Sequence, residues 1–417
     1  MGSSDASSRD LLHGIRVLSF GSFVAGNICA LMLAELGADV VKVESRTHPE
    51  ALRAYDAPGR PQVVEPSGVR TTTLFAGMTR GLRSMCIDMT NDAGRQTFRQ
   101  LAAQANVVVE NLGPGTVDSW GCSFDDLLAH NARLVMLSIS GYGRTGPLAG
   151  FRAYASNINN FVGLTSAWAL DGIHFDFVAG THGACAVVAA LREVDHGADG
   201  VFIDLAQTET AAAILPSLYL DFLANGREWD AGPNEIPGSF FSGVMRCLGD
   251  DAWVAVELED EEDWNQMCSL LERPELQLAS GRPTFGLKAS LHEATAAWAA
   301  MRTPMQATLV LQGSGLAAGP VHDGEDQWRD PQLRSRRSFV EVVHPDLGRL
   351  EYPDAPFPSG RPTGPRRSGP RLGEHTSDVL REWLGCSEAR VRNLRATEAI
   401  WQPSPSSPDA DGDEDAW

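Results

Sequence analysis

The sequence contains one glycine-rich loop of the kind that can hold the phosphates of a nucleotide. Gly141-Tyr-Gly143-Arg-Thr-Gly146 matches the pattern G-x-G-x-x-G and follows an apolar run. A dinucleotide site needs a helix to begin at this loop, so that the amides of its first turn meet the pyrophosphate. Here Pro147 follows, no amphipathic pattern begins, and the loop lies far from the first strand–helix turn. We therefore expect a functional loop of another kind and not an NAD site.

Two other combinations of reactive residues, one for a metal site and one for a hydrolase, are less specific. His174, Asp176 and His182 lie close together, but their spacing gives no i, i+4 pair of ligands on a helix, and no fourth ligand is evident. A Ser-His-Asp hydrolase is also poorly supported, because the sequence contains no G-x-S-x-G. From the residues alone, the sequence predicts neither a metal site nor a hydrolase.

The elements that must position such residues alternate between strands and helices in the first third of the chain. Apolar β runs are separated by segments with helical spacing, which predicts β-α-β crossovers and a parallel sheet covered on both faces. The predicted fold class is therefore α/β and doubly wound. Strands are expected at Ile15–Phe20, Asp39–Val43, Asn106–Glu110 and Arg133–Ile139, and helices at Ala25–Leu36, at Asp92–Gln104 with Asn91 as its cap, and at Asp125–Ala129.

The middle and the end of the chain follow other patterns. Residues 155–192 and 207–225 are Ala-rich with helical spacing, and residues 245–345 indicate a smaller α+β domain. The acidic run Glu257–Asp263 is expected to be the solvated start of a helix, where acids favour the helix dipole. Further strands are expected at Val201–Leu205 and Ala252–Val256, and a final helix pair at His375–Leu384 and Glu388–Ala396.

The composition limits the classes of function. The 417 residues carry 34 Lys+Arg against 54 Asp+Glu, a net charge of −20, which argues against nucleic-acid binding through the bulk field. The seven cysteines form no C-x-x-C pair and are expected to be reduced thiols. No secretory signal is visible, and no apolar run approaches the roughly 18 residues of a membrane span. We expect a soluble, cytoplasmic protein without membrane or nucleic-acid partners.

A series of short phrases, in a fixed order along the chain, resembles one known family. Any one phrase is weak, but their joint order and spacing over roughly residues 12–400 resemble the class III CoA-transferases. This is the CaiB/BaiF family, which includes formyl-CoA and carnitine CoA-transferases and the α-methylacyl-CoA racemases. The phrases are Gly14-Ile-Arg-Val-Leu18, Ala25-Gly26, Leu33-Ala-Glu-Leu-Gly-Ala-Asp-Val-Val-Lys-Val-Glu44, Arg83-Ser84, Ile87-Asp88, Val109-Glu-Asn-Leu-Gly-Pro-Gly115, Trp120-Gly121, Ser138-Ile-Ser-Gly-Tyr-Gly-Arg-Thr-Gly-Pro147, Leu372-Gly-Glu-His-Thr376 and Val379-Leu380.

The resemblance implies a two-domain subunit in an interlocked homodimer. A large Rossmann-like domain, made from both ends of the chain, would bind CoA beside a smaller α+β domain. On this basis residues 12–225 form the first part of the large domain, and residues 226–345 form a linker and the small domain. Residues 346–400 return to complete the large domain, and residues 401–417 form an acidic, disordered tail.

The resemblance also implies an activity and a nucleophile. In the transferase members a carboxylate attacks an acyl-CoA thioester, giving a mixed anhydride that CoA thiolate converts to an enzyme-bound thioester, from which an acceptor acid takes the CoA. Aligning Asp176-Phe-Val-Ala-Gly180 with the family puts Asp176 on this nucleophile, with Asp171 as the fallback because the preceding stretch is shortened. The substrates would be acyl-CoA and a small carboxylic acid, with no permanently bound cofactor and no metal.

By the same resemblance, CoA is expected to contact four short segments and some arginines. The backbone amides of Val24 and Ala25 would lie at a helix N-terminus, which favours an anion. Arg46, Arg53 and Arg83 are candidate phosphate partners. The remaining expected contacts are Ile87, Asp88, Asn111, Leu112, Arg152, Ala153, Tyr154 and Ala155.

One departure from the family pattern leaves two alternatives open. The usual G-Y-D after the glycine loop is here Ala153-Tyr154-Ala155. Racemase members carry a proton-transferring His at the Tyr position, so Tyr154 favours transfer, while the missing Asp at Ala155 puts either activity in doubt. The alternatives to a transferase are an acyl-CoA racemase or isomerase on the same fold and a CoA-binding homologue without catalysis.

Overall fold

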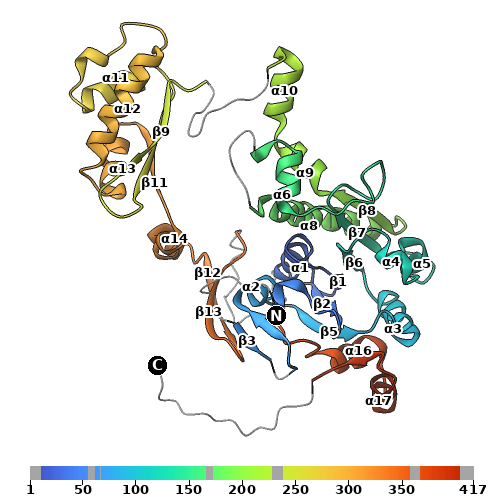
Figure 1. Cartoon of the computed structure of the whole chain (residues 1–417). Coiled ribbons are helices and arrows are strands. Elements are labelled where there is room, and N and C mark those ends of the chain that lie inside the picture. Colours follow the sequence, from blue (N-terminus) through green and yellow to red (C-terminus); the bar gives the residue numbers. More distant parts are fainter. Residues whose placement is uncertain are drawn as a thin grey trace, which may run out of the picture. The chain divides into compact units, whose positions relative to one another are not determined.

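The computed structural model describes residues 11–54, 62–65, 67–165, 172–227, 238–356 and 367–403. The chain divides into two compact units, which are described separately. The first unit comprises Met1–Gly163, Asp171–Pro216 and Arg336–Trp417, and the second comprises Leu164–Leu170 and Ser217–Ser335 (Figure 1). The first unit therefore takes residues from both ends of the chain.

A mainly parallel sheet forms the centre of the first unit. Within the described residues its seven strands are ordered β14-β5-β2-β1-β6-β7-β8, all parallel except β14, which pairs antiparallel with β5. The order reverses between β1 and β6, and a ligand site in such a sheet lies at the carboxyl ends of the strands near that reversal. The strands are β1 (Arg16–Phe20), β2 (Asp39–Glu44), β5 (Arg83–Ile87), β6 (Val107–Glu110), β7 (Val135–Ser140), β8 (Val201–Ala206) and β14 (Ile400–Trp401).

Helices bury both faces of this sheet, as the continuous apolar strands require. Val17 and Leu18 of β1 illustrate the alternation, because they point to opposite faces and belong to different core clusters. One cluster joins the sheet to α1 and α8, and the other joins it to α3, α5, α16 and α17. These helices are α1 (Ala25–Glu35), α8 (His174–Asp195), α3 (Asp92–Ala102), α5 (Phe124–Leu128), α16 (Thr376–Leu384) and α17 (Glu388–Ala396).

Helix α8 has the length and composition of a membrane span, contrary to the expectation that no such apolar run is present. It has 22 residues, and its most apolar window has a mean hydropathy of 1.2. The helix packs closely on α1, since a Cβ at Gly180 would lie 2.7 Å from the carbonyl oxygen of Ala25. Ala184, Val187 and Leu191 of α8 are buried in the same core cluster as α1 and the sheet. In this fold α8 is therefore a central core helix.

Shorter elements complete the first unit. The described part of the predicted helical region 155–192 includes α6 and α8, and the predicted helix at 207–225 is divided at Leu215, just before Pro216. The additional elements of the first unit are η1 (Ala51–Arg53), β3 (Gln62–Val64), β4 (Arg70–Thr72), α2 (Thr73–Met78), α4 (Thr116–Ser119), α6 (Ala155–Phe161), α9 (Gln207–Ile214), β12 (Phe339–His344) and β13 (Gly348–Pro353). Helix α10 (Pro216–Asn225) begins at the last residue of the segment Asp171–Pro216, and all of it except Pro216 belongs to the second unit.

The second unit contains a three-stranded antiparallel sheet, ordered β11-β10-β9, and its own core around the buried Trp264. The predicted acidic helix start is confirmed only for the second half of the run, because Glu257 and Leu258 end β10, whereas Asp260 caps α11 and three acids occupy its first turn. The elements are β9 (Phe241–Arg246), β10 (Trp253–Leu258), α11 (Glu261–Leu270), η2 (Pro274–Leu276), α12 (Phe285–Ala299), α13 (Pro304–Gly313), β11 (Ala317–Val321), α14 (Gly324–Arg329) and α15 (Pro331–Ser335).

Most strands and helices predicted from the sequence are present within one or two residues of the expected ends. Asn91 caps α3 as predicted, accepting hydrogen bonds from the amides of Ala93 and Gly94. The α/β class with a mainly parallel sheet is confirmed. The interlocked dimer and the predicted domain boundaries stay predictions, and the acidic tail beyond residue 403 lies outside the described residues.

Candidate active site

Two adjacent cavities lie at the carboxyl ends of the parallel strands in the first unit. We call them the Lys42 cavity, of about 290 Å³, and the Asp176 cavity, of about 420 Å³. The Lys42 cavity lies over β1, β2, β5 and β6, and the Asp176 cavity lies over β1, β6, β7 and β8. Both are lined by Ser22, Leu112, Gly113 and Thr116, so they share a common part at the reversal of strand order.

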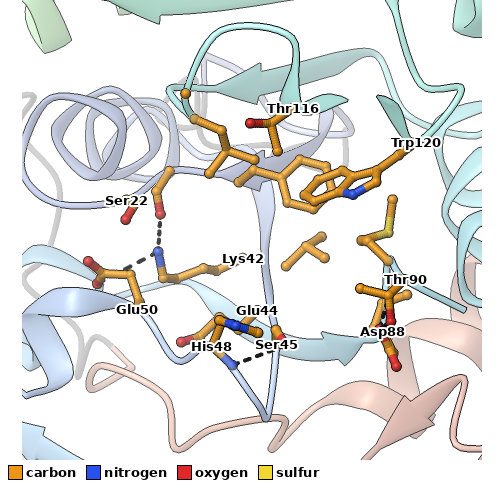
Figure 2. A pocket seen from close by; sticks show the side chains of 17 residues that line it. Ser22, Lys42, Glu44, Ser45, His48, Glu50, Asp88, Thr90, Thr116 and Trp120 are labelled. Atoms are coloured by element: carbon orange, nitrogen blue, oxygen red, sulfur yellow. Dashed lines mark hydrogen bonds and ion pairs between the residues drawn. The ribbon is translucent and has the colours of Figure 1, made fainter. Parts of the chain in front are cut away.

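A buried lysine lies beneath the Lys42 cavity (Figure 2). The side chain of Lys42 is 1% exposed, and its Nζ donates to the carbonyl oxygen of Gly21 and to Oδ1 of Asn27, the latter at 2.8 Å. A carboxylate oxygen of Glu50 lies 3.9 Å from this nitrogen. Burial lowers the pKa of Lys42, while the charges of Glu50 and Glu44 act in the opposite direction. Lys42 therefore fixes the chain that leaves β1 and does not stand free in the cavity.

The turn between β1 and α1 is held by side chains on both sides. Asn111 binds Ser22 twice, accepting from its amide and donating to its carbonyl oxygen, each at 2.7 Å. Phe23 has a positive φ of 52°, which is uncommon for a bulky residue. Its amide donates to Glu50 at 2.9 Å, and its carbonyl oxygen accepts from Asn27 at 2.5 Å. These four contacts determine how Phe23 and the following residues face the Asp176 cavity.

The predicted nucleophile, Asp176, lies in the first turn of α8. Asp176 lines the Asp176 cavity, is half-buried, and accepts a hydrogen bond from Nε2 of Gln207 at 3.3 Å. Burial raises the pKa of Asp176 to about 6, and the hydrogen bond from Gln207 opposes this shift. The carboxyl group is thus ionised at neutral pH and incompletely hydrated, which suits a nucleophile. The fallback, Asp171, lies outside the described residues.

The raised pKa of Asp176 predicts the acid limb of the pH profile. If ionised Asp176 attacks the substrate, kcat/KM should fall about tenfold per pH unit below pH 6 and level off above it. Gln207→Ala removes a hydrogen bond that lowers the pKa of Asp176, so the limb should move to higher pH. Measuring kcat/KM against pH for the wild type and for Gln207→Ala tests this prediction. An acid limb of Gln207→Ala at the same pH as in the wild type, or at a lower pH, contradicts it.

The G-x-G-x-x-G loop is anchored by ion pairs and is not followed by a helix N-terminus. The amide of Arg144 donates to both carboxylate oxygens of Asp204 at 3.0 Å, and its guanidinium contacts Asp118 and, at 3.1 Å, the buried Glu110. The next helix, α6, begins only at Ala155. A Cβ at Gly141 would lie 2.5 Å from that of Ala153. The loop therefore supports the segment 152–155 that lines the Asp176 cavity.

The structure brings most of the predicted contact residues to the two cavities. Ala25 is buried at the start of α1 without lining either cavity. Ile87 and Asp88 line the Lys42 cavity, and Leu112 lines both. The Asp176 cavity is lined by Val24, Asn111, Arg152, Ala153, Tyr154 and Ala155.

The three candidate phosphate arginines lie elsewhere. Arg83 is buried and forms ion pairs with Asp39 at 2.5 Å and Glu382 at 2.6 Å. Arg53 is completely buried between carboxylates. Arg46 is exposed but lies over the ring of Trp401, 5.2 Å from its centroid. We therefore no longer assign Arg53 and Arg83 to CoA phosphates, because both are engaged by acids within the fold.

Several residues of the site were missed from the sequence. Gln207 follows directly after β8, and the rule that ligands bind at carboxyl ends of parallel strands could have indicated it. Phe23 had no signal in the sequence that marks it as part of the site, because its left-handed backbone depends on contacts with Asn27 and Glu50.

The histidines considered for a metal site do not form one with other ligands among the described residues. His182 is exposed, with Nδ1 2.9 Å from the carbonyl oxygen of Val178. No metal-binding group of three or more side chains occurs in the part of the chain that the structure describes.

Comparisons with known proteins identify the family of the chain. A model of CoA-transferase family III matches residues 12–376. A probable CoA-transferase of Mycobacterium tuberculosis is 30% identical over 94% of this chain, which spans only 50% of that protein's length. Succinyl-CoA–D-citramalate CoA-transferase of Chloroflexus aurantiacus is 27% identical, covering 93% of this chain and 98% of that protein. Human succinyl-CoA:glutarate CoA-transferase is 24% identical, covering 96% and 92% respectively.

A solved structure supports the same assignment. The crystal structure of a CaiB/BaiF family protein from Brucella suis superposes with a TM-score of 0.76 at 25% identity, covering 89% of this chain and 99% of that one. The α/β fold and the named relatives define a CoA-transferase as the class of enzyme. The chain belongs to CoA-transferase family III, which confirms the resemblance seen in the sequence.

Proposed function

We propose that this chain transfers CoA from an acyl-CoA thioester to a carboxylic acid and that Asp176 carries the covalent intermediates. The observation that carries the proposal is a half-buried carboxylate, with a pKa of about 6, in a cavity at the carboxyl ends of the parallel strands that shares four lining residues with a second cavity. The names of the relatives, which transfer CoA from succinyl-CoA to citramalate or glutarate, support the class of reaction.

The proposed reaction proceeds through two covalent forms of Asp176. Its carboxylate oxygen attacks the thioester carbonyl carbon, the carbon–sulfur bond breaks, and CoA leaves as a thiolate. The thiolate then attacks the Asp176 carbonyl carbon of the anhydride and releases the donor acid as its carboxylate. The carboxylate of the acceptor acid repeats these steps in reverse, so that the thiolate ends on the acceptor and Asp176 is restored.

The first unit supplies the groups that hold CoA in this proposal. The nucleotide part would occupy the Lys42 cavity beside Ile87 and Asp88, and the pantetheine arm would pass Leu112 toward Asp176. Arg152 lies near the shared part of the cavities, since its Nε is 3.9 Å from the position of a Cβ on Gly113. It is the cation best placed to contact a CoA phosphate.

A racemase is less well supported by this cavity. Racemisation requires two proton-transferring groups on opposite sides of one carbon atom. Among the described residues that line the Asp176 cavity, Asp176 is the one carboxylate, and none is a histidine. A homodimer and a cytoplasmic location, both expected from the sequence, stay predictions.

Intact-protein mass spectrometry tests the proposed intermediate. Incubation with an acyl-CoA, with no acceptor present, should add the mass of CoA less one water to the full chain, and peptide mapping should place it on Asp176. Hydroxylamine should release the adduct. The Asp176→Ala protein should remain unmodified, and an adduct of equal yield on that variant would contradict the assignment.

A further inference from the structure

An aromatic pair stands at one side of the Asp176 cavity. The rings of Phe23 and Tyr154 meet edge to face, with centroids 5.5 Å apart and an angle of 70° between their planes. Both line the same cavity as Asp176, yet they are 39% and 57% exposed. Large apolar side chains are normally buried, so two exposed rings beside a reactive carboxylate suggest a surface for an apolar ligand.

The fold holds Phe23 in this place against a backbone preference. Its φ of 52° lies in the left-handed region, where a residue of this size is strained. Glu50 binds its amide, Asn27 binds its carbonyl oxygen, and the buried Lys42 contacts both of these side chains. Strain that is held by several buried partners is typical of functional positions. The ring is therefore presented to the cavity by a dedicated network.

The charges of the cavity argue for the class of group that the aromatic pair contacts. A second carboxylate on a substrate would be bound most strongly by a cation in the cavity, because charge-assisted hydrogen bonds are roughly twice as strong as neutral ones. Among the described lining residues Arg152 is the one cation, and it lies at the part shared with the Lys42 cavity. The other described lining residues, apart from Asp176 itself, carry no charge; they include the apolar Val24, Ile139 and Ile173 and the polar Asn111 and Gln207.

We propose that the acid transferred by this enzyme is a monocarboxylic acid with an apolar, preferably aromatic, side chain, and that the Phe23–Tyr154 pair contacts that side chain. This inference rests on the proposed transfer through Asp176. It assigns the Tyr154 ring to the acyl group and leaves Arg152 for CoA. It also separates this chain from relatives whose names specify succinate, citramalate or glutarate, all of which carry two carboxyl groups.

A donor pair tests the inference on the full chain. With phenylacetyl-CoA and succinyl-CoA as donors, we expect kcat/KM for the aromatic donor to be at least about tenfold higher. Tyr154→Ala should lower kcat/KM for phenylacetyl-CoA about tenfold, whereas Tyr154→Phe, which keeps the ring, should stay near wild type. The Kd of free CoA, measured by calorimetry, should be unchanged in both variants. Arg152→Gln should weaken both donors equally.

The outcomes separate this inference from the proposed function. If succinyl-CoA forms the Asp176-dependent adduct and is the better donor, the proposed function stands and the inference is wrong. A loss confined to succinyl-CoA in Arg152→Gln, or weaker binding of free CoA in Tyr154→Ala, also overturns the inference. If neither donor gives an adduct or turnover, the proposed function fails, and the inference fails with it.

Discussion

Replacing Asp176 by alanine is expected to lower the rate of CoA transfer by more than about 10⁴-fold, because both proposed covalent intermediates require its carboxylate. The side chain lines an open cavity and, within the described residues, makes one hydrogen bond, to Gln207, so its removal should leave the fold intact. Exchange between an acyl-CoA and its labelled free acid measures the loss. Unchanged circular dichroism and unchanged Kd for CoA should accompany it.

Three further variants show whether the position and the charge of this oxygen matter. Asp176→Asn keeps the size of the side chain without the negative charge and should be as inactive as Asp176→Ala. Asp176→Glu moves the carboxylate by one methylene group, and a displacement of this kind can reduce the rate about 10²-fold. Asp171→Ala is the matched control, which should retain activity. Near-normal exchange in Asp176→Ala, with loss in Asp171→Ala, would transfer the role to Asp171.

The parts of the fold that were predictable are those with local signals. Parallel strands buried on both faces are short apolar runs, and β1, β2, β6 and β7 have this composition. The helices α3 and α17 begin after capping residues, Asn91 and Ser387, whose side chains accept amide hydrogen bonds. Strands such as β14 have no such signal, because two residues become a strand only by pairing with β5 from the far end of the chain.

In the candidate site, too, some features were predictable from the sequence and others depend on contacts that form only in the folded chain. Asp176 was predicted through the order of family phrases, and nothing in the neighbouring sequence marks it as reactive. The positioning of the turn at Phe23 depends on Lys42, Asn27 and Glu50, whose contacts arise only in three dimensions. The assignment of Arg83 to CoA failed for the same reason, because one of its two acidic partners, Glu382, is 299 positions away. Long-range ion pairs are invisible to spacing and composition.

Arg53, one of the three arginines that the sequence suggested for phosphate binding, instead links the N-terminal part of the first unit to its C-terminal segment. Arg53 is completely buried and binds Glu44 through Nε at 2.7 Å and Nη2 at 2.9 Å, and Glu65 through Nη1 at 2.6 Å. It also donates to the carbonyl oxygen of Pro370 at 3.0 Å and lies 3.8 Å from the centre of the Phe75 ring. One side chain thereby connects β2, the β3–β4 hairpin and the C-terminal segment.

Replacing Arg53 by alanine is accordingly expected to destabilise the protein by about 3–5 kcal/mol, because it leaves two buried carboxylates without a cation. Arg53→Lys keeps one charge but cannot reproduce the planar, multi-acceptor contact, so it should lose less stability than Arg53→Ala but remain below wild type. Urea unfolding at pH 7, compared by midpoint and slope, measures both losses.

The pH dependence distinguishes a lost ion pair from a simple loss of packing. Burial alone would raise the pKa of Glu44, but Arg53 holds this pKa below its usual value in the folded protein. The ion pair therefore stabilises the wild type at pH values above the pKa that Glu44 has in the unfolded chain. This stabilisation is lost as the pH falls through the pKa that Glu44 has in the folded protein. Without Arg53, burial raises the pKa of the Glu44 and Glu65 carboxyl groups. The folded Arg53→Ala protein then binds more protons than its unfolded chain, so its stability rises as the pH falls. The difference between wild type and Arg53→Ala should therefore be smaller at pH 5 than at pH 7. A difference that does not change with pH, or one below about 1 kcal/mol at pH 7, would show that this buried cation does not hold the two chain ends together through its charge.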